Sequence, residues 1–149
     1  MGEAQAFDLL VDASLDNLQE VRSFIDRAGA NLGVIAPVLG DLKLAVDEVV
    51  TNVVLHGYGN AGGDVELHVR ADGNDLVISI LDRAGRFDPG KVQALRLDMP
   101  LQDRPAGGMG IFLIRQMTDR AEYLPRPGGG NEIRLLKRDA IDSAGRLAG

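Results

Sequence analysis

The sequence contains no cysteine and no tryptophan, and it has only two histidines among 149 residues. Without thiols, disulfide bonds, thiol nucleophiles and thiolate metal sites are all excluded. Two histidines are too few for a histidine-based zinc site. A metal ion in this protein would therefore be held by oxygen ligands such as carboxylates and carboxamides.

The sequence also lacks an excess of positive charge, a signal peptide and a long apolar run. Its formal net charge of −6 argues against nonspecific binding to nucleic acid or to an anionic membrane surface. Residues 1–12 carry acidic side chains and no basic segment, unlike a signal peptide, and no apolar run approaches membrane-spanning length. We therefore expect a cytoplasmic protein in which local backbone amides and individual basic residues hold any anionic ligand.

Apolar residues make up 45% of the chain and charged residues 26%, which is typical of one soluble domain spanning residues 1–149. Apolar spacing predicts an α+β fold, a two-layer sandwich with a mixed, mostly antiparallel sheet and helices on one face. We expect residues 65–69 and 76–81 to pair as a hairpin. Strands are predicted at 6–11, 65–69, 76–81, 121–124 and 133–136, and helices at about 15–28, 41–55 and 108–119.

Glycine and proline mark the expected breaks between these elements. Gly29 and Gly33 are predicted to end the first helix, and Pro37 and Gly40 to interrupt the segment after it. The tail 138–149 is polar and small, so we expect it to be frayed. The stretch between the strand at 76–81 and the last predicted helix has no clean period, which is typical of a functional loop or lid.

The helix predicted at 41–55 carries polar side chains at four-residue intervals. Glu48, Asn52 and His56 therefore fall on one helical face. A carboxylate and a carboxamide one turn apart suit Mg²⁺, which takes few protein ligands and keeps most of its water. The alternative is an exposed polar face with no function, and His56 has the further alternative of stabilising the helix C-terminus.

Two later segments add to this helix. Asp82 follows an apolar strand, where its carboxylate could accept a hydrogen bond from an exocyclic amine such as that of adenine, or could simply start a turn. Gly107, Gly108 and Gly110 lie where the last predicted helix begins. Backbone amides there can approach a polyphosphate, although the same pattern often makes only a turn.

Together these motifs resemble a known family. The run Glu-Val-Val-Thr-Asn…His-Gly-Tyr at 48–58, then Asp…Phe-Asp-Pro at 82–89, then Gly-Gly-Met-Gly-Ile-Phe-Leu-Ile-Arg-Gln at 107–116 is similar to the Bergerat-fold (GHKL) ATPases. The chain most resembles the small anti-sigma-factor serine/threonine kinases of the RsbW type. The resemblance extends from about residue 12 to residue 137, with the motifs in the expected order and spacing.

The resemblance implies a role for each matching position. Asn52 would coordinate Mg²⁺ between the phosphates, Glu48 would act as the catalytic general base, and Asp82 would read adenine. Residues 86–106 would form a mobile lid over ATP. The nucleotide-binding positions would be Asn52, Asp82, Ala84, Gly85, Phe87, Gly107, Gly108, Met109, Gly110 and Ile111.

The resemblance also implies an activity and partners. The expected function is transfer of phosphate from ATP, with Mg²⁺, to a serine or threonine of an anti-anti-sigma (STAS) protein. A sigma factor would compete with that substrate for the kinase. The family further implies a homodimer with no direct contact to nucleic acid or membrane.

One position departs from the family pattern, because Ala84 stands where a glycine usually follows the adenine-reading aspartate. If that position needs a positive φ, alanine is disfavoured by about 1 kcal/mol or more; if it needs only a small side chain, alanine is tolerated. The departure supports an alternative function, a nucleotide-binding module that sequesters a partner without turnover. A histidine-kinase catalytic domain is a third interpretation, opposed by the lack of a preceding helix with a phosphoacceptor histidine.

Overall fold

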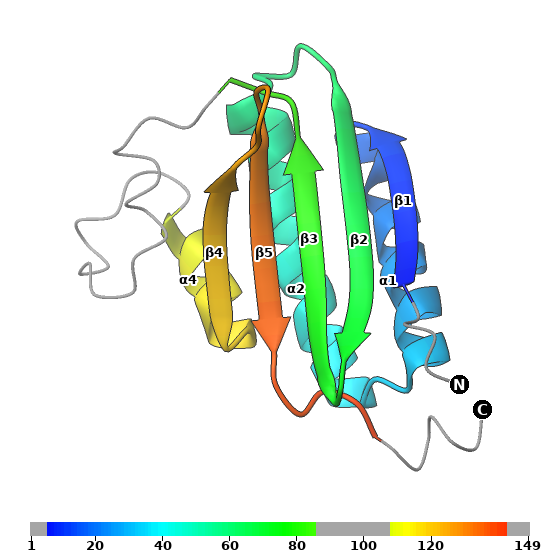
Figure 1. Cartoon of the computed structure of the whole chain (residues 1–149). Helices are drawn as coiled ribbons and strands as arrows, with labels where there is room; N and C mark the ends of the chain where they lie inside the picture. Colours follow the sequence, from blue (N-terminus) through cyan, green and yellow to red (C-terminus); the bar gives the residue numbers. More distant parts are fainter. Residues whose placement is uncertain (1–5, 86–107, 143–149) are drawn as a thin grey trace.

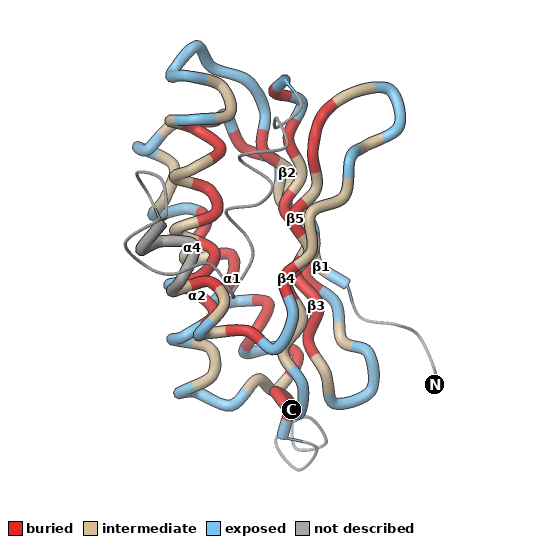
Figure 2. The backbone as a smooth tube through the Cα atoms, turned by 90° about the vertical axis from the view of Figure 1, so that its left-hand side faces the viewer, coloured by how far each residue is buried: buried red, intermediate tan, exposed pale blue. Residues whose placement is uncertain are grey.

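The computed structural model describes residues 6–85 and 108–142, with the side chains of 108–112 left out. It is a two-layer α+β sandwich in which helices cover one face of a sheet of five strands (Figures 1 and 2). The elements in chain order are β1 (Ala6–Asp12), η1 (Leu15–Asn17), α1 (Leu18–Leu32), α2 (Ala36–Asn52), η2 (Val53–Gly57), β2 (Asp64–Asp72), β3 (Asp75–Asp82), α4 (Gly108–Met117), β4 (Arg120–Pro125) and β5 (Asn131–Lys137).

The strand order is β1-β2-β3-β5-β4, and each of the neighbouring pairs is antiparallel. The predicted hairpin of β2 and β3 is confirmed, with Asp72 paired to Asp75 across a two-residue turn. Gly73 in that turn has a φ of 62° and Asn74 has no positive φ, which is the pattern of a type II′ hairpin turn. The fold class is therefore as predicted, with only antiparallel pairing among the described strands.

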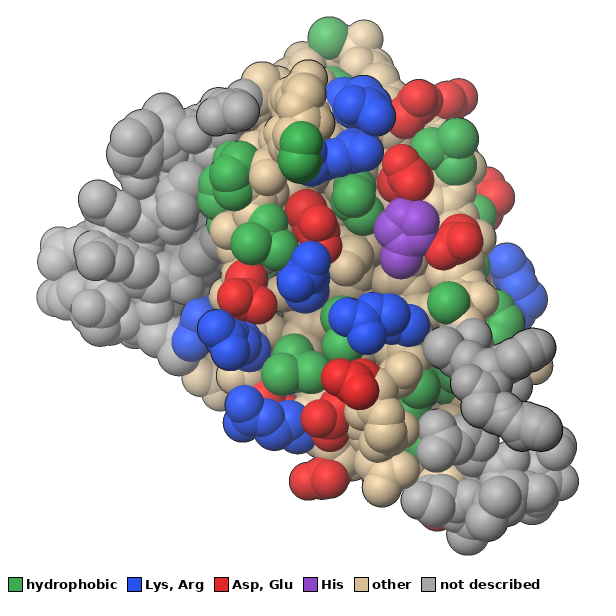
Figure 3. All heavy atoms as spheres, in the orientation of Figure 1, with side chains coloured by type: hydrophobic (Ala, Val, Ile, Leu, Met, Phe, Trp, Pro, Cys, Tyr) green, Lys and Arg blue, Asp and Glu red, His purple; other side chains and the backbone are tan. Residues whose placement is uncertain are grey.

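The core lies between the sheet and the helices. Alternate residues of β2 point inward, namely Val65, Leu67 and Val69, because successive strand side chains point to opposite faces. They meet the apolar stripe of α1, which includes Val21 and Ile25, and buried residues line the space between the layers in Figure 2. The outer face of the sheet is open and carries mixed acidic and basic side chains (Figure 3). No described helix is long and apolar enough to cross a membrane.

The first helix ends where one of its two predicted glycine breaks lies. Gly33 has a left-handed φ of 80° and closes α1, as predicted. The prediction that Gly29 also ends the helix is wrong, because Gly29 is buried within α1. A Cβ at Gly29 would lie 2.5 Å from Cδ1 of Leu39. The glycine therefore lets a side chain from the start of α2 pack closely against α1.

The second helix begins earlier than predicted. It starts at Ala36 rather than near residue 41, so Pro37 and Gly40 do not interrupt it. Pro37 lies in the first turn, where a backbone N–H has no helical partner and a fixed φ suits the helix. Gly40 faces open space. The sequence prediction omitted the first turn of α2 because it took proline and glycine to break a helix at any position.

The predicted frayed tail is wrong for its first part. Ala140 and Ile141 are buried, at 0% and 5% exposure. The backbone N–H of Ile35 donates to the carbonyl of Ala140 (2.9 Å), and that of Asp142 donates to the carbonyl of Gly33 (2.9 Å). The segment after β5 therefore fastens the connection between α1 and α2. Residues 143–149 and the lid predicted at 86–106 lie outside the described residues.

Candidate nucleotide-binding site

Asp82 is the last residue of β3, and it is buried with 1% exposure. Its Oδ1 accepts two hydrogen bonds, from the backbone N–H of Ala84 (2.9 Å) and from Nδ2 of Asn131 (2.9 Å). The first of these bonds is the local turn that Asp commonly makes with the residue two positions on. No described residue hydrogen-bonds Oδ2 of Asp82. Asp82 can therefore form the local turn through Oδ1 and still accept a hydrogen bond from a ligand through Oδ2.

The environment of this carboxyl group shifts its titration. Burial raises the pKa of Asp82 above its ordinary value. The hydrogen bonds from Asn131 and Ala84 and the positive charge of Arg126 act in the opposite direction. Perturbed pKa values concentrate at functional sites, which supports Asp82 as a candidate site residue.

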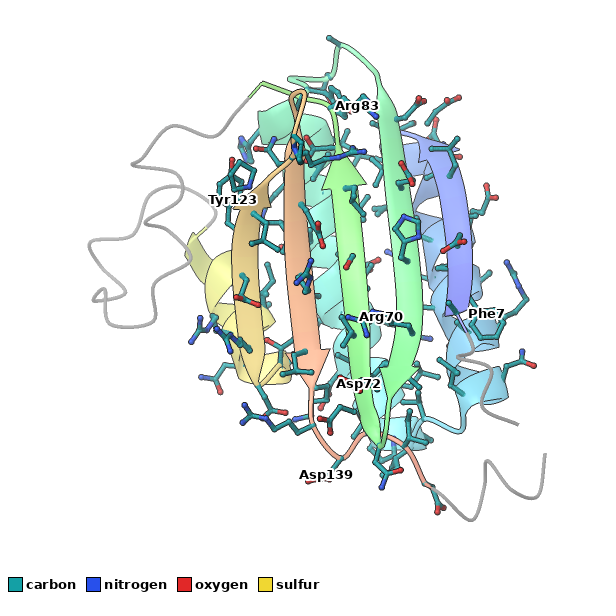
Figure 4. All side chains as sticks on the ribbon, viewed as in Figure 1. Phe7, Arg70, Asp72, Arg83, Tyr123 and Asp139 are labelled. Atoms are coloured by element: carbon teal, nitrogen blue, oxygen red, sulfur yellow. The ribbon has the colours of Figure 1, made fainter. Side chains whose placement is uncertain are left out.

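Asn131 is the first residue of β5 and lies opposite Asp82 in the strand register. It is completely buried, and besides its bond to Asp82 its Nδ2 donates to the carbonyl of Gly85 (3.1 Å). Its Oδ1 accepts a hydrogen bond from the hydroxyl of Tyr123 on β4 (2.7 Å). Figure 4 shows Tyr123 and Arg83 at the same end of the sheet. The end of β3 is thus tied to both following strands.

The turn between β4 and β5 closes tightly on the end of β3. Gly130 has a φ of 105°, and a Cβ there would lie 2.2 Å from the backbone carbonyl oxygen of Asp82. A side chain at this position would clash with backbone, so glycine is required. Nη1 of Arg126 in the same turn donates to that carbonyl (3.0 Å).

The structure decides between the two interpretations of Ala84. Among the described non-glycine residues only Asn60 and Asp139 have positive φ, so Ala84 has none and suffers no left-handed strain. Ala84 is buried, and its Cβ lies 3.4 Å from the place where a Cβ at Gly57 would be. A small side chain is therefore what the position requires, and this contact places the end of η2 beside the turn after Asp82.

Tyr58, directly after η2, holds the glycine-rich loop against the same turn. Its hydroxyl donates to the carbonyl of Asp64 (2.8 Å) and accepts the backbone N–H of Arg83 (2.7 Å). Gly63 passes under the ring, where a Cβ would lie 2.3 Å from it, and has a φ of 158°. The loop between η2 and β2 is thereby fixed at the edge of the site.

Glu48 and Asn52 lie one turn apart on α2, as predicted, and both are half-buried. Neither side chain makes a hydrogen bond or ion pair with a described residue, so their oxygen atoms are uncommitted in this part of the structure. No cluster of three or more acidic or histidine side chains in residues 6–85 and 108–142 is arranged to hold a metal. The oxygen atoms of Glu48 and Asn52 suit Mg²⁺, which needs few protein ligands, better than an ion that takes all its ligands from the protein.

His56 was predicted to stack on the same face, but the helix changes its period before reaching it. Asn52 is the last residue of α2, and η2 is a π-helical turn, so the α-helical four-residue spacing does not extend from Asn52 to His56. His56 is exposed. Short π-helical turns occur frequently at functional sites.

The second glycine segment opens a helix, as predicted, because α4 begins at Gly108. Its backbone includes Gly110, and α4 packs beside α2. The side chains of Met109 and Ile111 are not described, and Phe87 and Gly107 lie outside the described residues. The roles assigned to these positions stay predictions.

Sequence reasoning missed the residues that surround Asp82. Asn131, Tyr123 and Arg126 come from the last two strands and their turn, far from Asp82 in the sequence. An asparagine after three glycines is ordinarily a turn residue, so its type gives no signal. The one available clue was the predicted strand at 133–136, whose start would lie near the end of a neighbouring strand.

The sequence model of the histidine kinase-like ATPase domain matches residues 11–137. Its match covers most of the chain and includes α2, β3 and β5, which carry the site described above. The chain therefore belongs to the histidine kinase-like ATPase family, which confirms the predicted resemblance.

Curated relatives within this family carry more specific names. The chain is 30% identical over 117 residues to an anti-sigma F factor of Thermoanaerobacter sp. (strain X514), covering 78% of this chain and 81% of the relative. It is 27% identical over 150 residues to the serine-protein kinase RsbW of Halalkalibacterium halodurans, covering 95% of this chain and 90% of that one.

A solved structure has the same fold. The crystal structure of the RsbU and RsbW domains of Rv1364c from Mycobacterium tuberculosis matches with a TM-score of 0.64 and 20% identity over 90% of this chain. The present chain spans about a third of that one, 32%. At this identity the match supports the two-layer fold and not a particular activity.

Proposed function

We propose that this protein is an ATP-dependent protein serine/threonine kinase that acts as an anti-sigma factor in a partner-switching module. Its substrate would be an anti-anti-sigma (STAS) protein, and a sigma factor would be its second partner. The names of the relatives, anti-sigma F factor and serine-protein kinase RsbW, support this function. The coarser conclusion, a histidine kinase-like ATPase domain, is the family to which the chain belongs.

The observation that carries the proposal is the buried carboxylate of Asp82 at the end of β3. The turn that follows it contacts the end of η2, which continues from the helix bearing Glu48 and Asn52. A carboxylate accepts hydrogen bonds and does not donate them, so it suits the exocyclic amine of adenine. The contact between Gly57 and Ala84 would join this purine end of the site to the end of η2, which follows α2 directly. A nucleotide bound to both would lie along the helix.

The polar side chains of α2 would serve the phosphate end. Bound Mg²⁺ would neutralise charge on the transferring phosphate. Asn52 would hold the ion through its amide oxygen, and Glu48 would accept the proton of the substrate hydroxyl. The backbone N–H groups at Gly107, Gly108 and Gly110 would bind phosphate at the start of α4.

Glu48→Gln tests the chemistry. The protein is incubated with γ-labelled ATP, Mg²⁺ and the STAS partner, and ATP binding is measured separately by calorimetry. If Glu48 is the base, phosphate transfer falls at least about a hundredfold, since general bases contribute about 10²–10⁴-fold, while ATP affinity stays near that of the wild type. Asp41→Asn is the matched control, an exposed acid on the same helix, and should transfer phosphate normally.

The alternative function is a nucleotide-dependent binding module that sequesters its partner without turnover. Wild-type protein that binds ATP and partner but transfers no phosphate would establish it. Its main support in the sequence was Ala84, and the unstrained φ of that residue removes the conformational objection to nucleotide binding.

The partners also imply a location and an assembly. A sigma-factor partner would place the protein in the cytoplasm, with no contact of its own to nucleic acid or membrane. We further propose a homodimer, as the family resemblance implies. Sedimentation of the purified protein alone and with its STAS and sigma partners measures both the dimer and the exclusive binding of the two partners.

A further inference from the structure

We infer that Asn131 is a positioning residue that sets which purine the site accepts, by holding the carboxylate of Asp82 in one orientation as a hydrogen-bond acceptor. The role rests on the proposed function, because it concerns how the same site distinguishes adenine from guanine. Nothing in the sequence motifs or in the names of the relatives assigns a role to this residue.

The hydrogen bonds of Asn131 admit one amide orientation. Its Nδ2 faces two acceptors, Oδ1 of Asp82 (2.9 Å) and the carbonyl of Gly85 (3.1 Å). Its Oδ1 accepts from the hydroxyl of Tyr123 (2.7 Å). Rotating the amide by half a turn would place its oxygen against both acceptors, so the donor must point at Asp82.

The backbone reinforces this arrangement. Asn131 and Asp82 are paired residues in adjacent strands, and Asn131 is completely buried. At Gly130 the β4–β5 turn lies so close to the end of β3 that even a methyl group there would overlap the carbonyl of Asp82. A buried amide whose two N–H groups and oxygen are all hydrogen-bonded is rigid, because moving it would leave buried polar groups unpaired.

The chemical consequence concerns donors and acceptors. Adenine presents an N6 amino donor where guanine presents an O6 acceptor. An ionised Asp82 accepts from adenine and repels guanine, whereas a protonated Asp82 would donate to guanine. A donor fixed at Oδ1 favours the ionised form and leaves Oδ2 as the oxygen to which no described residue donates.

The other charged and titratable side chains described around Asp82 do not hydrogen-bond its carboxylate. Arg126, from the β4–β5 turn, donates to the backbone carbonyl of Asp82 and contributes positive charge. Tyr58 bonds the backbone N–H of Arg83, and the hydroxyl of Tyr123 bonds Asn131. Asn131 is the only described side chain that donates directly to the carboxylate.

The test compares wild type, Asn131→Asp and Asn131→Ala. Asn131→Asp keeps the shape but replaces the donating amide with a carboxyl group that repels an ionised Asp82, whereas Asn131→Ala removes the donor without adding charge. Leu135→Val is the control, a change of similar disturbance at a buried apolar position on the same strand. Affinities for Mg-ATP and Mg-GTP are measured at pH 6 and pH 8, and carbon NMR follows the titration of the Asp82 carboxyl without nucleotide.

We expect both Asn131 variants to bind ATP at least about tenfold more weakly, the loss of one hydrogen bond to a charged group. Their preference for ATP over GTP should narrow, more so at pH 6, and the Asp82 carboxyl should titrate at higher pH than in the wild type. The control should keep the wild-type preference and the wild-type titration.

Two results overturn the role. The first is an Asn131 variant that keeps the wild-type ATP-to-GTP ratio at both pH values, which would make Asn131 a structural residue only. The second is an unchanged Asp82 titration, which can be read even if nucleotide affinity is low. Wild-type protein that binds neither nucleotide would instead overturn the proposed function, so the two failures are distinguishable. If Asn131→Ala does not fold, Tyr123→Phe removes only the hydroxyl that orients the amide and should shift the ratio in the same direction.

Discussion

At the residue scale, Asp82 is held by groups that oppose its own burial. Desolvation favours the protonated carboxyl, while Asn131, the Ala84 N–H and Arg126 favour the ionised one. The net result is a pKa above the ordinary value of 3.8. Such a group destabilises the folded protein once the pH exceeds its raised pKa, because the unfolded chain ionises more easily. The destabilisation fades as the pH falls through that raised pKa.

Asp82→Asn should therefore keep or increase the stability of the fold and weaken the binding of Mg-ATP. The amide oxygen can still accept from Asn131 and Ala84, so the variant should resist urea at least as well as the wild type at pH 7.5. This advantage should shrink as the pH is lowered toward the ordinary aspartate range. Mg-ATP affinity should fall about ten- to a hundredfold, the effect of losing a hydrogen bond to a charged acceptor. Urea unfolding at several pH values and calorimetry measure the two effects.

A second titrating residue lies on the outer face of the sheet. The ring nitrogens of His68 on β2 bond Asp8 on β1 and Glu66 (3.0 Å). Burial alone would lower the pKa of His68, but these bonds and the two negative charges outweigh it and raise the pKa. The stabilisation is fully present below the ordinary value of 6.5 and is lost as the pH rises through the raised pKa.

His68→Gln should accordingly destabilise the protein more at pH 5.5 than at pH 8.5. The difference in urea midpoint between wild type and variant, measured at both pH values, checks the sign. His56→Gln is the control, because His56 is exposed and the described structure gives it no partner. A deficit of the His68 variant that is equal at both pH values would contradict the charged pair with Asp8.

At the element scale, the sequence predicted regular elements better than their ends. Apolar and polar residues alternate in β2, and β3 is a nearly continuous apolar run that follows a turn signal, so both strands were placed to within a few residues. The start of α2 was missed because proline at a helix N-terminus and proline in a helix interior look alike in composition, although only the second breaks the helix. The π-helical turn of η2 leaves no signature in residue type, and the stacking of His56 was lost with it.

The buried tail was missed for a different reason. Ala140 and Ile141 lie in a short polar segment without a period, and their burial depends on the position of the α1–α2 connection. The partners of Asp82 show the same limit within the site. Glu48 and Asn52 are neighbours on one helix and were predictable, whereas Asn131 is 49 residues from Asp82. Contacts of that range depend on strand order, which local patterns do not specify.

Ile141→Ala tests whether the tail is part of the folded domain. Ile141 is buried and bridges Val34 just after α1. Truncating it should lower the free energy of unfolding by about 2 kcal/mol or more, as for other buried aliphatic residues. Arg138→Ala, an exposed change in the same segment, should have little effect. Equal urea midpoints for the two variants would contradict the packing of Ile141 in the core.

At the scale of the whole molecule, one sheet and one helical layer share a single core, and the candidate site lies where the turn after β3 meets the end of η2. Ligand binding at such a junction should stabilise the entire fold. The gain is about 2.7 kcal/mol when free ligand is a hundredfold above its dissociation constant. The urea midpoint of the wild type should therefore rise with Mg-ATP concentration, and that of Asp82→Asn should rise only at about ten- to a hundredfold higher concentrations. A ligand-independent wild-type midpoint would contradict nucleotide binding.

The strand order has a consequence for the order in which a ribosome makes the molecule. The chain up to residue 85 contains β1, β2, β3 and both long helices, so most of the core can assemble early. The strand that completes the candidate site, β5, lies between β3 and β4 and is the last of the described strands to be synthesised. A nascent chain therefore carries the buried acid of β3 before its amide partner exists. Under the proposed function, recognition of a purine would therefore be acquired only after β5 has been made.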